Sequence, residues 1–176
     1  MGTRSYIAKQ VGPDQYRTIF CQLGGYLEEV GATLAGYYDT EEMVDKLLDL
    51  GDIYTLQPKL TPDPSMEHNE SISQKDVTLA FGRDMGDINW PSTIQTMDEL
   101  MDNTEGAEFL YIFDENKKWL YLGYLEMYDD LRDLKEVLDR NDIRYRPEEQ
   151  SEDTAPEQSR NEEETEAETT GTQLRM

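Results

Sequence analysis

The chain has 176 residues, 39 acidic and 16 basic, and a formal net charge of −23. This charge excludes the broad basic surface that neutralises phosphates, so we expect no direct binding to DNA. One cysteine and one histidine exclude a disulfide framework and a Cys/His zinc site. Residues 1–9 have no apolar core of signal-peptide length, and no segment approaches the roughly 18 apolar residues of a membrane span, so we expect a cytoplasmic protein without membrane contact.

The acidic residues fall into two parts of the chain. Residues 147–176 contain 10 acidic and two basic residues, no aromatic residue and one large aliphatic residue, Leu174. Such a segment cannot bury enough apolar area to offset the entropy of ordering it, so it is predicted to be a disordered acidic tail. Residues 1–146 keep 29 of the acidic and 14 of the basic residues, a net charge of −15, and are predicted to form a single domain.

The chain begins with a predicted β-hairpin and a helix. Aromatic and β-branched residues fill residues 5–9 and 16–23, and a segment with the composition of a turn separates them. Apolar residues then recur at helical spacing in residues 26–38. Gly31 and Gly36 weaken this helix by about 1 kcal/mol each, and such small residues suggest close packing.

A second amphipathic helix is predicted to follow. Asp39, with Glu42 three positions later, resembles a capping box, and the apolar stripe ends at Gly51, a typical C-terminal signal. Residues 51–75 carry three prolines among polar residues, which predicts a long connection with at most a short turn of structure. Residues 77–81 predict the third strand.

The second half of the domain predicts a short helix, a hairpin and a last helix. Thr96 and Glu99 form a capping box that starts a helix ending near residue 101 or 102. The apolar segments 107–113 and 118–124 predict two paired strands, which should lie centrally in the sheet. Residues 128–140 predict a closing helix with one apolar face.

The predicted order of elements is β-β-α-α-β-α-β-β-α. Strands joined by hairpins, with helices between them, are typical of an α+β fold. We therefore expect a mostly antiparallel sheet of about five strands, packed by helices on one side.

Few side chains point to catalysis. His68 lies in the proline-rich connection and is expected to be an exposed loop residue. Cys21 lies in a predicted strand and is expected to be a small buried hydrophobe. Cysteine or serine hydrolase chemistry is therefore disfavoured, and the chain is more readily a binding protein than an enzyme.

Carboxylate side chains leave one catalytic class open. Aspartate and glutamate can hold Mg²⁺ or Mn²⁺, and Glu28 with Glu29, or Asp84 with Asp87, are close in sequence. Because 39 acidic residues make such pairs common by chance, we expect no metal and no cofactor. A folded surface of carboxylates could instead occupy a basic groove that evolved for DNA or RNA. The alternative is an acidic domain that is merely well solvated.

Four segments resemble a family of small acidic proteins from phages, plasmids and other mobile elements of Gram-positive gut bacteria. The resemblance covers much of residues 3–125, and its motifs are not tied to a known chemistry. The segments are RSYI (4–7), YRTIFC (16–21), GYLEEVGATL (25–34) and LGDI (50–53). Some small acidic proteins of such elements are anti-CRISPR inhibitors of the type II effector nuclease, and this chain is similar to them in size and charge.

The chain departs from that family at the end of the second predicted strand. The family pattern there is Cys-His-Trp-Asp-Gly-Tyr-Pro-Glu, whereas residues 21–28 read CQLGGYLE. Gln22, Leu23 and Gly24 thus stand where the family has His, Trp and Asp. If those positions serve a ligand or catalysis in the family, this chain has lost that site, which favours a binding protein over an enzyme.

The charge and the resemblance together predict an inhibitor of host defence, acting in the cytoplasm of a bacterial host. Its most specific form is an anti-CRISPR protein that binds the type II effector nuclease, or its guide RNA complex, through acidic surface. A metal-dependent nuclease acting on guide RNA or another nucleic acid, and a non-catalytic phage accessory protein, are the alternatives. Gly25, Tyr26 and Gly31 are predicted to be structural. The acids predicted to contact the partner are Glu28, Glu29, Asp84, Asp87, Asp129, Asp130 and Asp133.

Overall fold

The computed structural model describes residues 2–86, 88, 90–125 and 130–145. The predicted tail, residues 147–176, lies outside this range, so its disorder stays a prediction. The start of the predicted closing helix, residues 128 and 129, also lies outside it.

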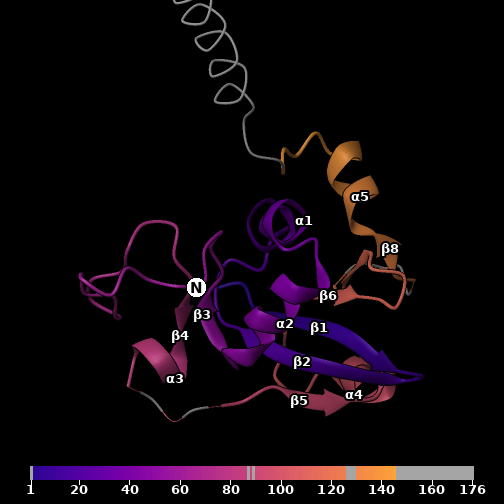
Figure 1. Cartoon of the computed structure of the whole chain (residues 1–176). Coiled ribbons are helices and arrows are strands. Elements are labelled where there is room, and N and C mark those ends of the chain that lie inside the picture. The colour runs from indigo at the N-terminus through magenta and orange to yellow at the C-terminus, as the bar shows by residue number, and fades with distance from the viewer. Residues whose placement is uncertain (1, 87, 89, 126–129, 146–176) are drawn as a thin grey trace, which may run out of the picture. The chain divides into compact units, whose positions relative to one another are not determined.

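The described strands form one mixed sheet in the order β4-β3-β2-β1-β6-β7-β8, with β5 paired to β2 beside this path (Figure 1). An α+β fold is thus confirmed, with more strands than the five expected. The strands are β1 (Ser5–Gly12), β2 (Gln15–Cys21), β3 (Ile53–Thr55), β4 (Leu79–Ala80), β5 (Thr93–Gln95), β6 (Phe109–Phe113), β7 (Trp119–Gly123) and β8 (Arg132–Asp133).

The sheet is less antiparallel than predicted. The hairpins β1–β2 and β6–β7 are antiparallel as expected, but β1 pairs with β6, and β2 with β3, in parallel. The β1–β6 pair joins residues about 100 positions apart, Ser5 with Phe109, and puts β1 in the middle of the sheet. Two neighbouring parallel strands need a long crossover connection. For β1 and β6, this connection includes the whole segment between the β1–β2 hairpin and the β6–β7 hairpin.

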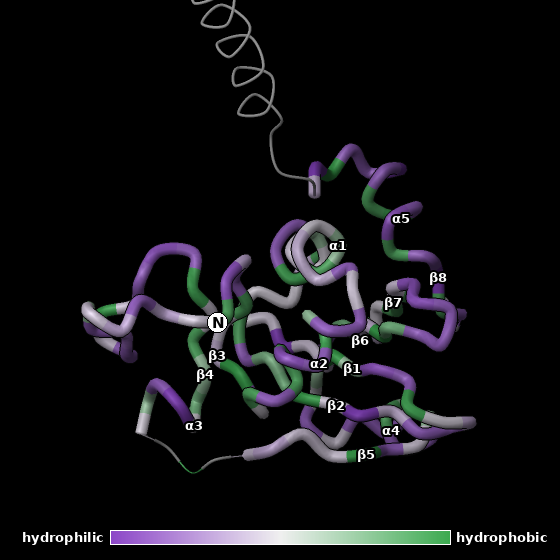
Figure 2. The backbone as a smooth tube through the Cα atoms, viewed as in Figure 1, coloured by the Kyte–Doolittle hydropathy of each residue, from purple (hydrophilic) through white to green (hydrophobic). Residues whose placement is uncertain are grey.

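Helices cover both faces of the sheet, whereas the sequence predicted one. The larger core contains Ile7 and Ile19 from the sheet and residues of η1, α1, α2 and α5. The opposite core contains Tyr6 and Ala8, which alternate with Ile7 along β1, and Leu100 of α4. The helices are η1 (Leu27–Gly31, a π-helix), α1 (Ala32–Tyr37), α2 (Glu41–Asp49), α3 (Phe81–Asp84), α4 (Met97–Asp102) and α5 (Leu134–Arg140). Figure 2 shows hydrophobic and hydrophilic residues alternating along α5, as expected for a helix packed on one side.

The helix starts show which capping predictions were right. The Thr96 hydroxyl accepts a hydrogen bond from the Glu99 backbone N–H at 3.2 Å, and a Glu99 carboxylate oxygen accepts one from the Thr96 N–H at 2.8 Å. This capping box starts α4 as predicted. The capping box predicted at Asp39 is wrong, because Thr40 is the N-cap of α2 and accepts a hydrogen bond from Met43.

The predicted structural residues after β2 pack against two aromatic residues of β6, Tyr111 and Phe109. The Tyr111 hydroxyl, from β6, donates a hydrogen bond to the Gly25 carbonyl oxygen at 2.7 Å. A Cβ atom at Gly31 would lie 3.4 Å from the same tyrosine, at the short end of ordinary van der Waals contact, so η1 packs closely on the sheet here. Tyr26, the N-cap of η1, is half exposed and packs against Phe109 with ring centroids 6.0 Å apart.

No helix in the described part of the chain is long and apolar enough to cross a membrane.

Candidate functional site

Four of the acids predicted to contact a partner lie on neighbouring elements. Glu28 and Glu29 are exposed on η1, and Asp130 is exposed just before β8. Asp133 is half-buried as the N-cap of α5, where it accepts a hydrogen bond from the Glu136 N–H at 3.1 Å. Because α5 contacts η1, Glu28, Glu29 and Asp133 lie on two adjoining elements, and Asp130 lies three residues before Asp133. We call Glu28, Glu29, Asp130 and Asp133 the η1–α5 acids.

The other predicted acids do not join this group. The Asp84 side chain is only 4% exposed, and its oxygens accept hydrogen bonds from Arg83 Nε at 2.7 Å and the Ala80 N–H at 2.7 Å. It lies on α3, next to β4 and thus at the opposite end of the sheet from β8. Its oxygens are therefore used inside the fold. Asp87 and Asp129 lie outside the described residues.

His68 belongs to the same buried network, so the expectation of an exposed loop histidine is wrong. Its side chain is 3% exposed, Nδ1 accepts a hydrogen bond from the Gln74 N–H at 3.0 Å, and Nε2 lies 3.0 Å from the Thr78 carbonyl oxygen. An acceptor at Nδ1 places the proton on Nε2, which is also 3.5 Å from an Asp84 oxygen. The His68 ring thus links the proline-rich connection to the segment leading into β4 and to α3, so its role is structural.

Several described basic side chains are paired with acids, but none of these pairs includes Glu28 or Glu29. Lys9 and Lys117 both form ion pairs with Glu41. Their hydrogen bonds lower the pKa of Glu41, and the hydrogen bond from Lys9 has the larger effect. No described Lys or Arg lies within ion-pair distance of Glu28 or Glu29. The further pairs are Lys9–Asp45 at 2.7 Å, Arg17–Asp49 at 2.8 Å and Lys46–Glu42 at 3.4 Å.

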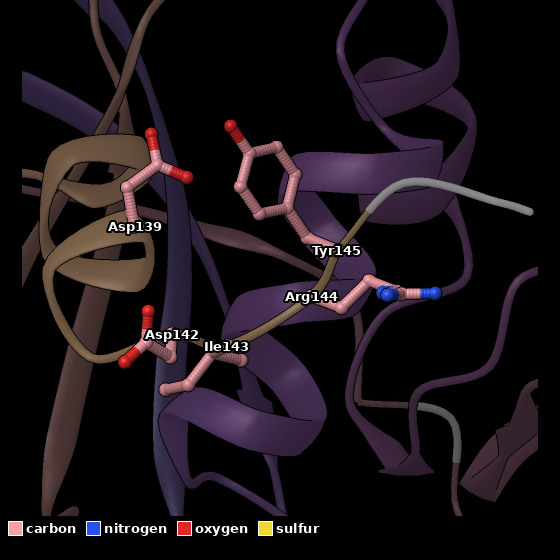
Figure 3. Close-up of a pocket in the computed structure, with 5 residues that line it drawn as sticks. All are labelled: Asp139, Asp142, Ile143, Arg144 and Tyr145. Carbon is pink, nitrogen blue, oxygen red and sulfur yellow. The ribbon is translucent and has the colours of Figure 1, made fainter.

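A shallow cavity of about 320 Å³ follows α5. Figure 3 shows the Asp139 carboxylate and the Tyr145 ring on either side of it, and the Arg144 guanidinium pointing away from both aspartates. Asp142 and Ile143 complete the lining. The cavity includes Tyr145, the last described residue, and its mixed polar groups favour no single class of ligand.

A second cavity, of about 220 Å³, lies where the outer edge of β2 is divided between two partners. Residues Tyr16 to Thr18 pair with β5, and Cys21 pairs with β3. Between them, the Phe20 N–H has no strand partner and donates instead to Asp52 Oδ1 at 2.9 Å. The Asp52 carboxylate therefore replaces a missing strand contact. We call this cavity the Asp52 pocket.

The backbone holds Asp52 firmly in this position. Its N–H donates to the Trp90 carbonyl oxygen at 2.8 Å, and its carbonyl oxygen accepts from the Phe81 N–H at 3.3 Å. The preceding Gly51 has φ +76°, and a Cβ atom there would lie 2.3 Å from the Trp90 carbonyl oxygen. Only glycine permits both this turn and this close approach.

Acidic, polar and aromatic groups line the Asp52 pocket. Burial raises the pKa of Asp52 to about 6, with a further contribution from the Glu105 charge, although the Phe20 N–H opposes both. Burial also raises the pKa of Glu105, whose N–H lies 3.4 Å from the Tyr6 hydroxyl. Gln95 Oε1 is shielded from solvent and accepts no hydrogen bond within the described structure. The complete lining is Tyr6, Thr18, Ile19, Phe20, Asp52, Trp90, Pro91, Thr93, Gln95 and Glu105.

The Asp52 pocket was not predicted from the sequence. Its lining comes from β1, β2, the residue before β3, β5 with the segment leading into it, and the turn after α4. The one available signal was Asp52 itself, a carboxylate that follows a helix-ending glycine and precedes a strand.

Two other chemistries find little support in the described residues. Cys21 is fully buried, and burial raises the pKa of its thiol to about 12, so it is a structural residue as predicted. No three His, Cys, Asp or Glu side chains come together at metal-binding distance in the part of the chain that the structure describes.

Comparisons with protein-family models, with curated proteins and with solved structures found no match to this chain.

Proposed function

We propose that this chain is a binding protein that occupies the nucleic-acid site of a basic protein partner through acidic surface. Following the family resemblance, we further propose that the partner is the type II CRISPR effector nuclease or its guide RNA complex, and that binding inhibits it. The protein would then be a mobile-element inhibitor of host defence, acting in the cytoplasm of the bacterial host.

The observation that supports this proposal most directly is the exposed charge of Glu28 and Glu29. Glu28 and Glu29 are exposed, adjacent and without an ion-pair partner among the described basic residues. A compact domain with a net charge of −15 is destabilised by self-repulsion, so retention of such charge is more readily explained by binding than by folding. Exposed carboxylates also accelerate association with a basic surface, because attraction acts beyond contact distance.

Charge reversal of one side of the molecule tests the proposal. We expect Glu28→Lys combined with Glu29→Lys to reduce inhibition of target-DNA cleavage by the guide-loaded effector at least tenfold. Glu70→Lys combined with Glu115→Lys makes the same change in net charge at two exposed loop residues outside the η1–α5 acids, and we expect it to have a much smaller effect. Equal loss in both variants would mean that only total charge matters.

Salt dependence provides a second measurement. Between about 0.1 and 0.5 M salt the Debye length falls from about 10 Å to roughly 4 Å, so attraction between exposed charges weakens. We expect the affinity for the effector to fall over this range. Affinity that is insensitive both to salt and to the Glu28 and Glu29 reversals would contradict binding through acidic surface.

The two alternative functions, a metal-dependent nuclease and an accessory protein, predict different results in assays with guide RNA and the effector. A metal-dependent nuclease would cleave labelled guide RNA, with or without the effector, and EDTA would stop it. Intact RNA together with blocked loading or target binding would support the inhibitor. An accessory protein would leave the effector fully active, and a pull-down from host lysate would then recover another partner.

A further inference from the structure

We propose that the Asp52 pocket binds an arginine side chain of the basic protein partner. This inference rests on the proposed function for the source of the arginine, but the chemistry of the pocket can be tested without that partner.

The pocket presents hydrogen-bond acceptors and lacks a matching cation. Asp52 Oδ1 is used by Phe20, whereas Oδ2 has no hydrogen-bond donor among the described groups. Gln95 Oε1 is shielded and unpaired, and the Glu105 carboxylate lines the same cavity. No described Lys or Arg lies within 4.0 Å of either carboxylate. A shielded acceptor without a donor, such as Gln95 Oε1, is unfavourable. A ligand that supplies an N–H group to it and positive charge to the two carboxylates would therefore bind favourably here.

The shape and walls of the pocket favour a guanidinium group. A volume of about 220 Å³ is below the 300–1,000 Å³ typical of small-molecule sites, so it suits a single side chain. Aromatic residues, Tyr6, Phe20 and Trp90, line it. A guanidinium is planar, stacks on aromatic rings and carries five donors, whereas a lysine ammonium is compact and more strongly hydrated.

The surroundings of the pocket fit a protein ligand. Trp90 is 46% exposed at the pocket, and Ile94, which pairs with Arg17 at the β2–β5 edge, is 61% exposed. The Trp90 ring also packs edge-on against Phe81, with centroids 5.6 Å apart, which holds it in place. Arginine anchors that enter a pocket beside exposed aromatic and aliphatic residues are a common feature of protein interfaces. Because the Asp52 and Glu105 carboxylates line the pocket, a positively charged ligand would complement its charge.

A small probe tests the pocket chemistry on the full-length protein. We expect N-acetyl-L-arginine amide to produce saturable chemical-shift changes in the ¹⁵N–¹H spectrum at the Phe20 amide and the Trp90 indole. The neutral isostere N-acetyl-L-citrulline amide should produce none. Asp52→Asn should weaken the arginine probe about tenfold, and it keeps the acceptor for the Phe20 N–H, so the spectrum also reports whether the fold is intact.

The matched control is Asp39→Asn, which removes one exposed carboxylate outside the pocket. We expect it to leave the probe affinity unchanged. Equal shifts with the citrulline compound, or equal affinity in wild type and Asp52→Asn, would overturn the inference.

The effector assay separates failure of the pocket from failure of the proposed function. If Asp52→Asn loses the arginine probe and also loses inhibition about tenfold, both proposals are supported. If it loses the probe but the wild-type chain never inhibits the effector, the pocket stands and the proposed partner is wrong. If the Glu28 and Glu29 reversals abolish inhibition but Asp52→Asn changes neither probe binding nor inhibition, the pocket inference is wrong and the proposed function stands.

Discussion

The carboxylates of this protein occupy two environments that give the same group different physical roles. Glu28 and Glu29 on η1 are exposed and have no ion-pair partner among the described residues, so their charge acts over long distances and is screened by salt. Asp52 and Asp84 are shielded and hydrogen-bonded to backbone N–H groups, so their charge acts at contact distance. Net charge alone therefore does not identify the functional acids. Under the proposed function, the exposed group would accelerate association, whereas the shielded group determines local structure.

The largest expected loss of stability comes from disrupting the turn at Gly51 that positions Asp52. Gly51→Ala would place a Cβ atom 2.3 Å from the Trp90 carbonyl oxygen at a positive φ, and we expect the free energy of unfolding to fall by about 3 kcal/mol or more. Gly86→Ala is the matched control, because Gly86 has φ +72° with nothing within 4 Å, and we expect a loss of only about 1 kcal/mol. Urea unfolding measures both. Equal losses would mean that the contact with Trp90 is unimportant.

Removing the charge of Asp84 should cause the next largest loss in the free energy of unfolding. Asp84→Asn cannot accept the hydrogen bonds of both Arg83 and Ala80 in the same way, and it leaves the guanidinium without a counter-charge. We expect the free energy of unfolding to fall by about 2 kcal/mol. Asp39→Asn, at an exposed position, should change it little. A stability of Asp84→Asn equal to that of wild type would contradict the structural role assigned to this network.

Removing the charge of Asp52 should instead increase the free energy of unfolding at neutral pH. Its pKa of about 6 in the folded state is above the usual value of 3.8, so its protonation favours folding at low pH, and that contribution is lost as the pH rises from about 4 through 6. The full shift corresponds to roughly 3 kcal/mol. Screening by solvent reduces it, so we expect Asp52→Asn to gain about 1 kcal/mol at pH 7.

The gain of Asp52→Asn should disappear near pH 4, where the wild-type carboxyl is also neutral in the folded protein. Unfolding curves at pH 4 and pH 7 measure the difference. Asp52→Ala should be less stable than Asp52→Asn at both pH values, because it leaves the Phe20 N–H without an acceptor. A stabilising loss of charge, together with weaker binding of the arginine probe, is the pattern expected of a residue kept for function rather than stability.

The sequence predicted the local elements well and the long-range ones poorly. The β1–β2 hairpin, the α4 capping box and the β6–β7 hairpin depend on residues close in sequence, and all three are confirmed. The parallel β1–β6 pair depends on residues about 100 positions apart, and no local pattern indicates it. Strands β3, β5 and β8 have only two or three residues, too few for a periodic signal.

The candidate sites follow the same division. Exposure of Glu28 and Glu29 was predictable, because they sit on the polar side of an amphipathic segment. Burial of His68 was not, because its partners Gln74 and Thr78 are brought to it by the folded connection between β3 and β4. Burial of Asp84 was not predictable either, because the His68 ring of that connection lies 3.5 Å from its carboxylate. The Asp52 pocket needs five separate segments to meet, so only the structure brings its acceptors together.

The smallest expected effect on stability belongs to the exposed pair, and it separates the two environments most clearly. Glu28→Gln combined with Glu29→Gln removes two charges without reversing them, and we expect the melting temperature to change by no more than about 2 °C. Affinity for the effector should nevertheless fall about threefold to tenfold at 0.1 M salt, with a flatter dependence on salt, because long-range attraction is reduced. The same measurements on Asp52→Asn should show weaker affinity with a salt dependence close to that of wild type, since a shielded contact is screened less. Identical salt slopes for the two variants would mean that both groups act only through net charge.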